Sequence, residues 1–379
     1  MRILFVSGVS IGGSIRSTGE LARRLAARDI PVGVLQRVPD TGVLRYVHTR
    51  AVNLGVKLHA VTPAAKAVGA AAATIGRRPR TRPDADGIRH WDTILPENSL
   101  PAVCRSFRPD VVVAASVSRT GWRRMRTWLS EHGIASVLYI REEAALGHLG
   151  ISHAPPDLLL ANAHTYADQA EALGFPATMV PSVVTLDDYV VESSRTHALF
   201  INPVDTYGVD RALALATARP DIPFSFVEWW DLGDDGRAAL RAELAGRPNV
   251  ELRPSVSDPA KLYTDARLLL TPYTLDMRPR VVLEAQVNGI PVLATDLPAL
   301  SETVGPGGVL VAPDAPIDDW IAALGTLYDD ETEYQRLVHA ARLHAARDEV
   351  DPDSVVTRFT DALTVAVGRR AETPPAVPR

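Results

Sequence analysis

The sequence of 379 residues holds a single cysteine, Cys104. One cysteine excludes an internal disulfide framework and a cysteine-ligated metal cluster, and we expect it to be a buried small residue. The chain also has no apolar run near the ~20 residues that span a bilayer. Residues 1–9 are apolar but too short for a signal peptide, and they lack a small-residue cleavage site. These absences predict a cytoplasmic protein for which membrane association is not expected.

An excess of basic residues is also lacking, because the formal net charge is −5. Nucleic acid is therefore not expected as the main partner, since it normally requires a basic field. The spacing of Gly8, Gly12 and Gly13 is not the GxGxxG of dinucleotide folds, which disfavours NAD binding. The sequence shows no HExxH, no Walker loop and no nucleophile elbow. We therefore predict no metal site and no cofactor.

Short apolar runs alternate with helical patterns along most of the chain. The first series has strands near residues 2–7, 30–35, 110–115, 136–140 and 158–161, and the second begins at residues 199–201. Such alternation predicts parallel doubly wound sheets, and the length favours two domains. The predicted fold class is α/β, with two tandem Rossmann-like domains facing across a cleft. The predicted boundaries are 1–185 for the first domain, 196–350 for the second, 351–369 for a helix that packs back on the first, and 370–379 for a disordered tail.

Residues 50–100 are the least informative part of the chain. Residues 63–75 are alanine-rich and predict a helix. Residues 76–87, GRRPRTRPDADG, have four arginines and two prolines without periodicity, so we expect a mobile loop. Farther on, residues 318–346 and 353–369 predict two terminal helices.

Residues 268–296 read as strand, loop, helix and strand. Pro279 stands where a first helical residue belongs, and Asn288-Gly289 ends the helix with residues that tolerate left-handed geometry. Asp276 and Glu284 bracket the helix entrance. Free N–H groups at a helix start suit a phosphate, and carboxylates can hold the diols of a sugar. This stretch therefore predicts a site for an anionic, hydroxyl-rich ligand.

The same stretch resembles family-4 glycosyltransferases of the GT-B fold. The family pattern is an acid, seven residues, a glutamate, then a small-residue helix and Gly-[IV]-Pro-Val; here it stands as Asp276 to Glu284 followed by AQVNGIPVLATD and LPALSETVGPGGVLV. The resemblance extends to Gly12-Gly13, LLLAN and ALGFPATMVPSVV, and is strongest over residues 268–311. It implies transfer of a sugar from a nucleotide-sugar donor with retention of configuration, without a metal.

The resemblance also implies roles for individual residues. Glu284 would bind the donor ribose, Asp276 the donor sugar, and the amides of Arg280 and Val281 the diphosphate. The loop at residues 252–255 would hold the base. The full set of predicted residues is, for catalysis, Asp276, Arg280 and Arg141; for the donor, Gly12, Gly13, Arg253, Pro254, Asp276, Met277, Arg278, Arg280, Val281 and Glu284; and for the acceptor, His90, Trp91, Glu142 and His148.

The chain departs from the family pattern in four places. Asp276 replaces the usual glutamate, and Pro279, which has no N–H, stands near a family glycine. The family's Arg and Lys pair is missing from FINPVDTYGVDRALAL, where Tyr207 precedes the glycine. Arg141 is nearest to the position of the family's histidine in the first domain. Arg280, Arg278 or Arg141 would have to neutralise the departing phosphate instead.

The function that this resemblance implies is transfer of a sugar from an NDP-sugar, with UDP favoured, to the hydroxyl of a small-molecule or glycan acceptor, such as a small secondary metabolite of a bacterium. Two alternatives stay open. One is a relative that binds a nucleotide-sugar without transferring a normal sugar, which the missing Arg and Lys pair favours. The other is an NDP-sugar epimerase, which needs acid and base pairs that the sequence does not place. The oligomeric state is not determined by the sequence.

If Glu284 binds the ribose, the Glu284→Ala variant should bind nucleotide more weakly and remain folded. Calorimetric titration with UDP measures the affinity. An affinity equal to that of the unmodified chain would refute the role of Glu284.

Overall fold

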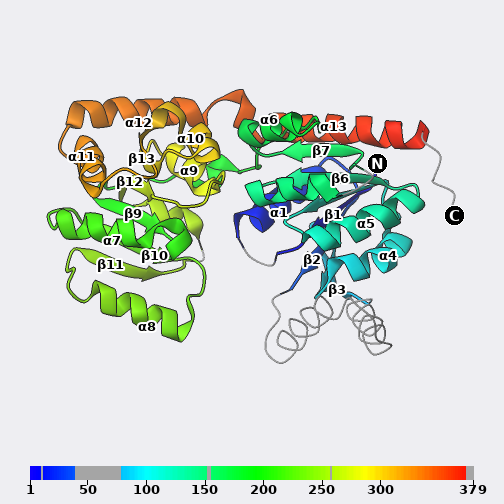
Figure 1. Ribbon diagram of the computed structural model, residues 1–379, viewed down its shortest axis with the longest axis horizontal. Helices are drawn as coiled ribbons and strands as arrows, with labels where there is room; N and C mark the ends of the chain where they lie inside the picture. The colour runs from blue at the N-terminus through cyan, green and yellow to red at the C-terminus, as the bar shows by residue number, and fades with distance from the viewer. Residues whose placement is uncertain (10–11, 39–77, 152–154, 257, 373–379) are drawn as a thin grey trace. The chain divides into compact units, whose positions relative to one another are not determined.

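The computed structural model of the chain describes residues 1–9, 12–38, 78–151, 155–256 and 258–372 (Figure 1). These residues form two compact units, and each is described here by itself. The N-terminal unit comprises residues 1–162, 166–180 and 356–379, and the C-terminal unit comprises residues 163–165 and 181–355, each to the extent described. The predicted helix at residues 63–75 lies outside the described residues.

The N-terminal unit is built on an eight-stranded sheet with strand order β3-β4-β2-β1-β5-β6-β7-β8. Every neighbouring pair except β3 and β4 is parallel. The central strands are buried along their whole length, as parallel strands covered on both faces must be. The elements are β1 (Ile3–Ser7), α1 (Gly13–Ala26), β2 (Val32–Arg37), β3 (Arg80–Ala85), β4 (Ile88–Thr93), α4 (Pro96–Phe107), β5 (Val111–Ala115), α5 (Arg119–Glu131), β6 (Ala135–Ile140), η1 (Glu143–Ile151), β7 (Leu158–Ala161), α6 (His164–Ala172), β8 (Thr178–Met179) and α13 (Pro352–Glu372).

The expectation of a mobile loop at residues 76–87 is wrong for the part of it that the structure describes. β3 pairs antiparallel with β4 through a tight turn at Asp86 and Gly87, which have φ angles of 53° and 72°. Asp-Gly is a strong signal for a hairpin because both positions require left-handed geometry. The arginines and prolines before it obscured that signal. The strictly parallel sheet expected for this domain therefore gains one antiparallel edge strand.

The C-terminal unit has a six-stranded, wholly parallel sheet with strand order β11-β10-β9-β12-β13-β14. The order reverses between β9 and β12, so the crossover helices cover both faces of the sheet. The elements are η2 (Leu186–Tyr189), β9 (His197–Ile201), η3 (Asp205–Tyr207), α7 (Val209–Ala218), β10 (Phe224–Glu228), α8 (Gly233–Leu244), β11 (Val250–Pro254), η4 (Pro259–Tyr263), β12 (Ala266–Thr271), α9 (Arg280–Gln286), β13 (Val292–Thr295), α10 (Pro298–Val304), η5 (Gly305–Gly307), β14 (Gly308–Val311), α11 (Ile317–Tyr328), α12 (Glu331–Ala345) and η6 (Asp348–Val350).

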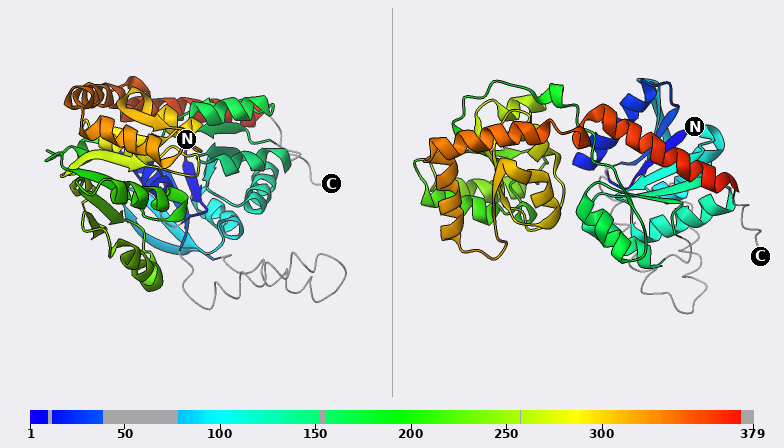
Figure 2. Two further views of the ribbon diagram at one scale, coloured as in Figure 1. Left: turned by 60° about the vertical axis from the view of Figure 1, so that its left-hand side comes forward. Right: turned by 90° about the horizontal axis from the view of Figure 1, so that it is seen from above.

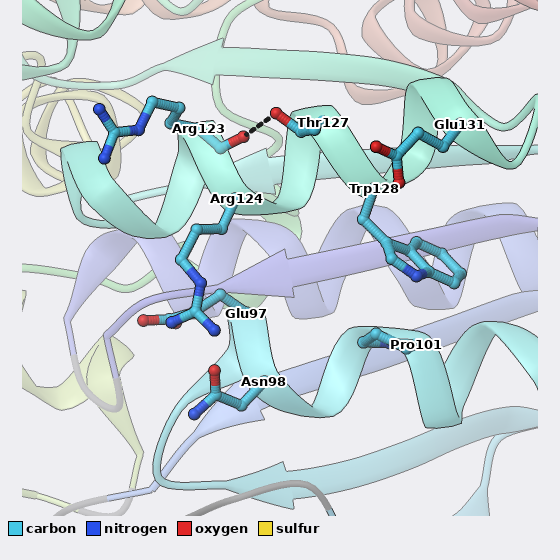
Figure 3. A pocket seen from close by; sticks show the side chains of 8 residues that line it. All are labelled: Glu97, Asn98, Pro101, Arg123, Arg124, Thr127, Trp128 and Glu131. Atoms are coloured by element: carbon cyan, nitrogen blue, oxygen red, sulfur yellow. Dashed lines mark hydrogen bonds between the residues drawn. The ribbon is translucent and has the colours of Figure 1, made fainter. Parts of the chain in front are cut away.

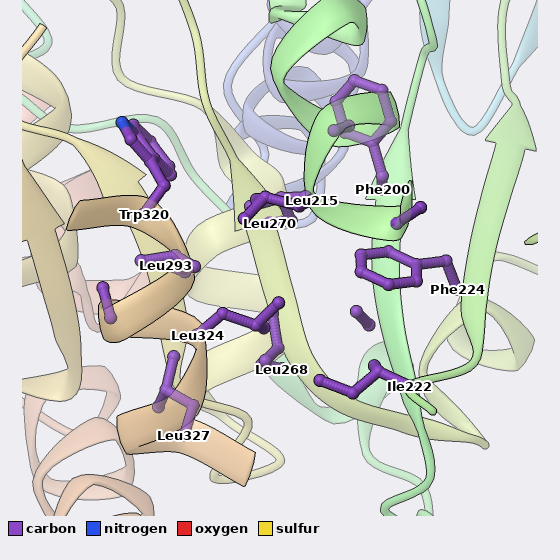
Figure 4. Packing of buried hydrophobic residues seen from close by; sticks show 14 of the residues in the cluster. Phe200, Leu215, Ile222, Phe224, Leu268, Leu270, Leu293, Trp320, Leu324 and Leu327 are labelled. Carbon is purple, nitrogen blue, oxygen red and sulfur yellow. The ribbon is translucent and has the colours of Figure 1, made fainter. Parts of the chain in front are cut away.

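A hydrophobic core on one face of this sheet joins the strands to α7 and α11 (Figure 4). Phe200 and Phe226 meet edge to face with their ring centroids 5.0 Å apart. Trp320 and Leu324 of α11 are fully buried against Leu270 and its neighbours. Burial of each large apolar side chain contributes about 1.5–3 kcal/mol, which anchors the strands whose ends carry the candidate site.

The single helix expected at residues 318–346 is two helices, α11 and α12. The break comes at Asp330, whose carboxylate accepts a hydrogen bond from the backbone N–H of Glu333 at 3.0 Å and so begins a new helix. The apolar pattern continues through the break, and this is why the sequence suggested one element. The N-cap at Asp330 thus begins a new helix although the apolar periodicity continues.

The last helix, α13, runs along the N-terminal unit, and Figure 2 shows its course. Phe359 stacks on Phe5 of β1 with centroids 5.8 Å apart. Among the described helices, α13 included, none combines the length and the apolar character that crossing a bilayer requires.

Gly208, between β9 and α7, should resist substitution more than other left-handed glycines. It has φ 77°, and a Cβ there would lie 1.9 Å from the carbonyl oxygen of Pro272. Gly233 of the same unit has φ 70° but open space around it. We expect Gly233→Ala to cost about 1–2 kcal/mol of unfolding free energy from backbone strain alone, and Gly208→Ala at least twice as much. Urea unfolding followed by tryptophan fluorescence measures both; equal losses would contradict the close approach of the two loops.

Candidate functional site

The carboxyl edge of the C-terminal sheet is where ligands of doubly wound folds bind, at the point where the strand order reverses. In this unit that point lies between β9 and β12. The loops that follow the two strands contact each other there, because the N–H of Thr274 donates to the carbonyl of Thr206 at 3.2 Å. The segment with the family-like pattern starts directly after β12, so the predicted site residues are attached to this edge.

An aromatic cluster occupies the place where the resembling family carries its basic pair. The ring of Tyr207 meets those of Tyr273 and Trp230 edge to face, at centroid distances of 4.4 and 5.3 Å. Burial raises the pKa of Tyr207 to about 12, so its hydroxyl stays neutral. The sequence showed Tyr207 in the unusual position, but its partners could not be identified without the fold. This cluster gives the edge an apolar lining instead of a cationic one.

Asp276 is bound to the start of α10. Its carboxylate accepts hydrogen bonds from the backbone N–H of Ala299, at 2.9 and 3.1 Å, and from that of Leu300 at 3.2 Å. These are N–H groups that a helix start leaves without helical partners. Asp276 therefore ties the loop after β12 to the segment after β13 while it stays half-buried at the edge.

Glu284 and Arg280 form a buried pair on one face of α9. Glu284 is 2% exposed and Arg280 is 7% exposed, and Arg280 Nε lies 3.2 Å from Glu284 Oε1. The hydroxyl of Tyr263 donates to Glu284 Oε2 at 2.8 Å. Arg280 also donates to the carbonyl of Val183 at 3.0 Å and to the hydroxyl of Tyr189 at 2.9 Å. Glu284 and Arg280, which are both predicted to bind the donor, are thus hydrogen-bonded to groups of their own unit.

Arg278 lies between two other carboxylates. Its guanidinium is 2.8 Å from Glu302 and 3.2 Å from Glu349. Burial alone would raise the pKa of Glu349, but hydrogen bonds from His164 and Arg278 hold that pKa below its ordinary value. Arg278 is therefore neutralised inside its own unit.

His164, Glu302 and Glu349 each offer a ligand atom, and these atoms lie within 4.8 Å of one another. A metal ion could be held by such a set, yet Arg278 already supplies positive charge to both carboxylates. Glu302 also accepts hydrogen bonds from the backbone N–H of His164 and Thr165 at 3.0 and 3.1 Å. The set fits a structural ionic network better than a metal centre.

The space around the start of α9 is small. A cavity of about 20 Å³ is lined by Arg278, Pro279, Arg280 and by residues of the segment before η2 and of η6. That volume holds about one water molecule. A diphosphate would therefore have to bind on the outer side of the α9 start, where Met277 and Val281 are partly exposed.

The other two predicted donor-site residues of this unit, Arg253 and Pro254, are the last residues of β11, beside the tryptophans that follow β10. Arg253 Nη1 forms an ion pair with Asp265 at 2.8 Å, and Pro254 is exposed at the end of β11. Trp229 and Trp230 follow β10, and the N–H of Trp230 donates to Asn202 Oδ1 at 2.9 Å. These segments lie on the carboxyl edge of the sheet.

In the N-terminal unit, the carboxyl edge beside β1 and β5 carries the predicted glycine loop. A Cβ on Gly8 would lie 2.1 Å from the carbonyl oxygen of Ser116, so the loops after these strands touch. Gly12 has φ 105° at the start of α1, and Gly13 is exposed as its first residue. Ser14 and Ser116 are joined through their hydroxyls at 3.3 Å. The order of the strands reverses here too.

Arg141, Glu142 and His148 follow β6 on the same edge. Arg141 is 9% exposed and its guanidinium lies over the ring of Tyr139, 4.8 Å from the centroid. Glu142 is exposed, and His148 Nε2 is 2.8 Å from the carbonyl oxygen of Val117. The topology therefore brings these three predicted residues to one edge of the unit.

His90 and Trp91 lie within β4 instead of on a binding loop. Trp91 is 5% exposed and packs edge to face on Phe107 at 5.7 Å, and His90 is half-buried opposite Val34 of β2. Core packing accounts for Trp91 without a ligand. The acceptor role expected for both residues stays a prediction.

The buried pair on α9 should be strongly coupled. Removing one partner leaves an uncompensated buried charge, which costs about 3–5 kcal/mol. We expect Arg280→Met and Glu284→Gln each to lower the unfolding free energy by about that amount, and the double variant to lose less than their sum. The earlier expectation that Glu284→Ala leaves the fold intact changes accordingly, because Tyr263 and Arg280 both depend on this carboxylate.

Urea unfolding of the single and double variants measures the coupling. Arg336→Met is a matched control, because Arg336 pairs with Glu333 on the exposed face of α12 and should change stability little. Additive losses from the two α9 variants would mean that the side chains act independently.

Comparison with known proteins finds a family match in the C-terminal unit. Residues 182–330 match the model of the family described as "Glycosyl transferases group 1". A D-inositol 3-phosphate glycosyltransferase of Paenarthrobacter aurescens (strain TC1) is 34% identical over 131 residues, which are 34% of this chain and 30% of that protein. The match thus spans about a third of the length of the curated relative.

Solved structures resemble the chain over nearly its whole length. Sucrose-phosphate synthase from Thermosynechococcus elongatus gives a TM-score of 0.74 at 13% identity, covering 98% of this chain and all of that one. Anabaena HepE in complex with UDP-glucose gives 0.70 at 13% identity, covering 96% and 99%. At this identity the likeness establishes the fold. The chain thus has the fold of two Rossmann-like domains that these structures share, and residues 182–330 match the glycosyl transferases group 1 model.

Proposed function

We propose that the protein is a retaining glycosyltransferase that moves a sugar from an NDP-sugar, with UDP favoured, to an acceptor hydroxyl. The observation that carries the proposal is the family match over residues 182–330, which contains the segment from Asp276 to Glu284 at the reversal point of the sheet. The fold shared with HepE, whose structure contains UDP-glucose, supports the donor class. Asp276, half-exposed at this edge, is the carboxylate that we assign to the donor sugar.

In the proposed reaction, the amides of Arg280 and Val281 bind the diphosphate, and Glu284 holds the ribose. Glu284 accepts hydrogen bonds from the hydroxyl of Tyr263 and from Arg280 in the structure, and these two groups fix the orientation of its carboxylate. The N-terminal unit supplies Gly12 and Gly13 to the donor. Arg141 is the basic residue of that unit that we assign to the leaving phosphate.

We assign the acceptor to the N-terminal unit, with Glu142 and His148 as contacts on its carboxyl edge. A small secondary metabolite of a bacterium is the acceptor class that we propose, and the cytoplasm is the proposed compartment. The reaction as proposed needs neither a metal nor a cofactor, because the departing phosphate accepts the proton of the acceptor hydroxyl on the same face.

One observation favours a second candidate, a protein that binds a nucleotide-sugar without transferring the sugar. Arg253, Arg278 and Arg280 are each paired with carboxylates of their own unit. The space enclosed at the start of α9 holds about one water molecule. A weakly cationic donor edge would stabilise a departing diphosphate less than the family's basic pair does.

Incubation with a panel of NDP-sugars separates the two candidates. We expect NDP release from at least one donor to rise above background when a hydroxyl acceptor is added, and EDTA to leave the rate unchanged. NMR of the product should show the anomeric configuration of the donor. Saturable UDP binding with no release for any donor and acceptor would favour the second candidate.

Asp276→Ala should lower kcat/KM by about 100-fold, the range seen when one group that stabilises a transition state is removed. This variant also loses a helix cap, so Asp330→Ala is the matched control, because Asp330 caps α12 away from the edge. We expect similar losses of stability from both variants but a loss of activity only from the first. Equal activities in the two variants would remove Asp276 from the mechanism.

A further inference from the structure

A cavity of about 640 Å³ opens at the amino edge of the sheet in the N-terminal unit. We call it the amino-edge pocket. Its walls are the last turn of α4, the end of α5, the last turns of α13, and the loops before β5 and β6. Substrates of doubly wound folds bind at the opposite, carboxyl edge. The amino-edge pocket is therefore separate from the donor and acceptor site proposed above.

The lining of the amino-edge pocket is cationic, although the whole chain is acidic. Arg105 and Arg108 are exposed in it, and Arg370 lines it from α13. Asp110 is the one carboxylate among these described lining residues, and its Oδ2 accepts the backbone N–H of Arg2 at 2.6 Å. Three helices, α4, α5 and α13, end beside the pocket, and each end carries about half an elementary negative charge. The three arginines together outweigh Asp110 and these helix ends.

A second observation comes from two arginines buried behind the pocket wall. Arg126 is 5% exposed and Arg370 is 8% exposed, and both face the same carboxylate oxygen of Asp157 at 3.6 and 3.7 Å. The other oxygen of Asp157 accepts the N–H and the hydroxyl of Ser136, each at 2.8 Å. One carboxylate is thus the ion-pair partner of two buried guanidinium groups, and both N···O distances are too long for a hydrogen bond.

Some N–H groups of these arginines lack partners. Nε of Arg370 and Nη1 of Arg126 make no hydrogen bond, although both atoms are buried. Burial lowers the pKa of Arg126, Asp157 opposes this, and the positive charge of Arg370 lowers it further. An unsatisfied buried cation is costly, and such groups often mark the place of an ion.

We propose that the amino-edge pocket binds a phosphate-bearing small molecule through Arg105, Arg108 and Arg370. Guanidinium groups match phosphate oxygens in a forked geometry, and the volume lies within the usual range for small-molecule sites. Trp128 and His132 stack with their centroids 3.9 Å apart and form an aromatic wall beside the arginines. A phosphate bound there would place negative charge beside Arg370, which shares the carboxylate of Asp157 with Arg126. The carboxyl edge would stay free for the proposed sugar transfer.

A neighbouring groove between α4 and α5 provides the contrast. This groove of about 460 Å³ shares Trp128, but its arginines are balanced by Glu97 and Glu131. Figure 3 shows Arg124 reaching from α5 toward Glu97 of α4. Arg123 lines this groove and not the amino-edge pocket. It lies on α5, the helix that carries Trp128, and so offers a matched control.

The test uses the full chain labelled with ¹⁵N, and the indole N–H signal of Trp128 is assigned from the Trp128→Phe variant. Inorganic phosphate and pyrophosphate are titrated separately, and vesicles with and without phosphatidylglycerol are added in a parallel series. We expect saturable shifts of the Trp128 signal with the soluble anions. The Arg105→Gln, Arg108→Gln double variant should weaken the affinity at least tenfold, whereas Arg123→Gln should leave it unchanged.

Three results would overturn the proposal: no shift of the Trp128 signal with either anion, equal affinity in the double variant, or an effect from the anionic vesicles alone. Pyrophosphate that binds only at the donor edge would leave the Trp128 signal in place. A separate titration of Arg370→Gln, with folding checked by circular dichroism, should also lose affinity, because it removes the buried member of the set.

Discussion

The ion pair between Arg280 and Glu284 lies inside the C-terminal unit, and the candidate donor segment is organised around it. The pair joins α9 to η4 through Tyr263 and to η2 through Tyr189. A buried pair is costly to desolvate, so its hydrogen bonds must be complete. Here all of the groups come from one unit, and this fixes the orientation of α9 at the end of β12.

This arrangement has a consequence for the chemistry of the site. Arginines that could have neutralised a departing phosphate are held by carboxylates, and an aromatic cluster around Tyr207 lies where a basic pair is expected. In the proposed reaction, backbone amides and the helix start then provide much of the stabilisation of the diphosphate. The donor edge that we propose thus relies more on fixed dipoles than on mobile charges.

The N-terminal unit distributes charge in a different way. Its carboxyl edge carries glycines, hydroxyls and Arg141, while the opposite edge gathers Arg105, Arg108 and Arg370 around a cavity. Two edges of one sheet can hold different ligands because the buried strands between them keep the two edges apart. The proposed phosphate site uses charge that the proposed transfer reaction does not need.

The periodicity of the sequence determined the α/β class, the parallel strands and the element at residues 268–296, because buried strands and helix ends leave local signals. The Asp86-Gly87 turn and the helix cap at Asp330 also have local sequence signals. The surrounding arginines and prolines, and the apolar periodicity that continues through Asp330, made these signals hard to recognise. Only the tertiary structure decided the partners of Glu284, Arg278 and Asp276, and the cavity between α4, α5 and α13. Contacts between residues distant along the chain depend on how the helices and strands pack, and the sequence pattern of one element does not predict that packing.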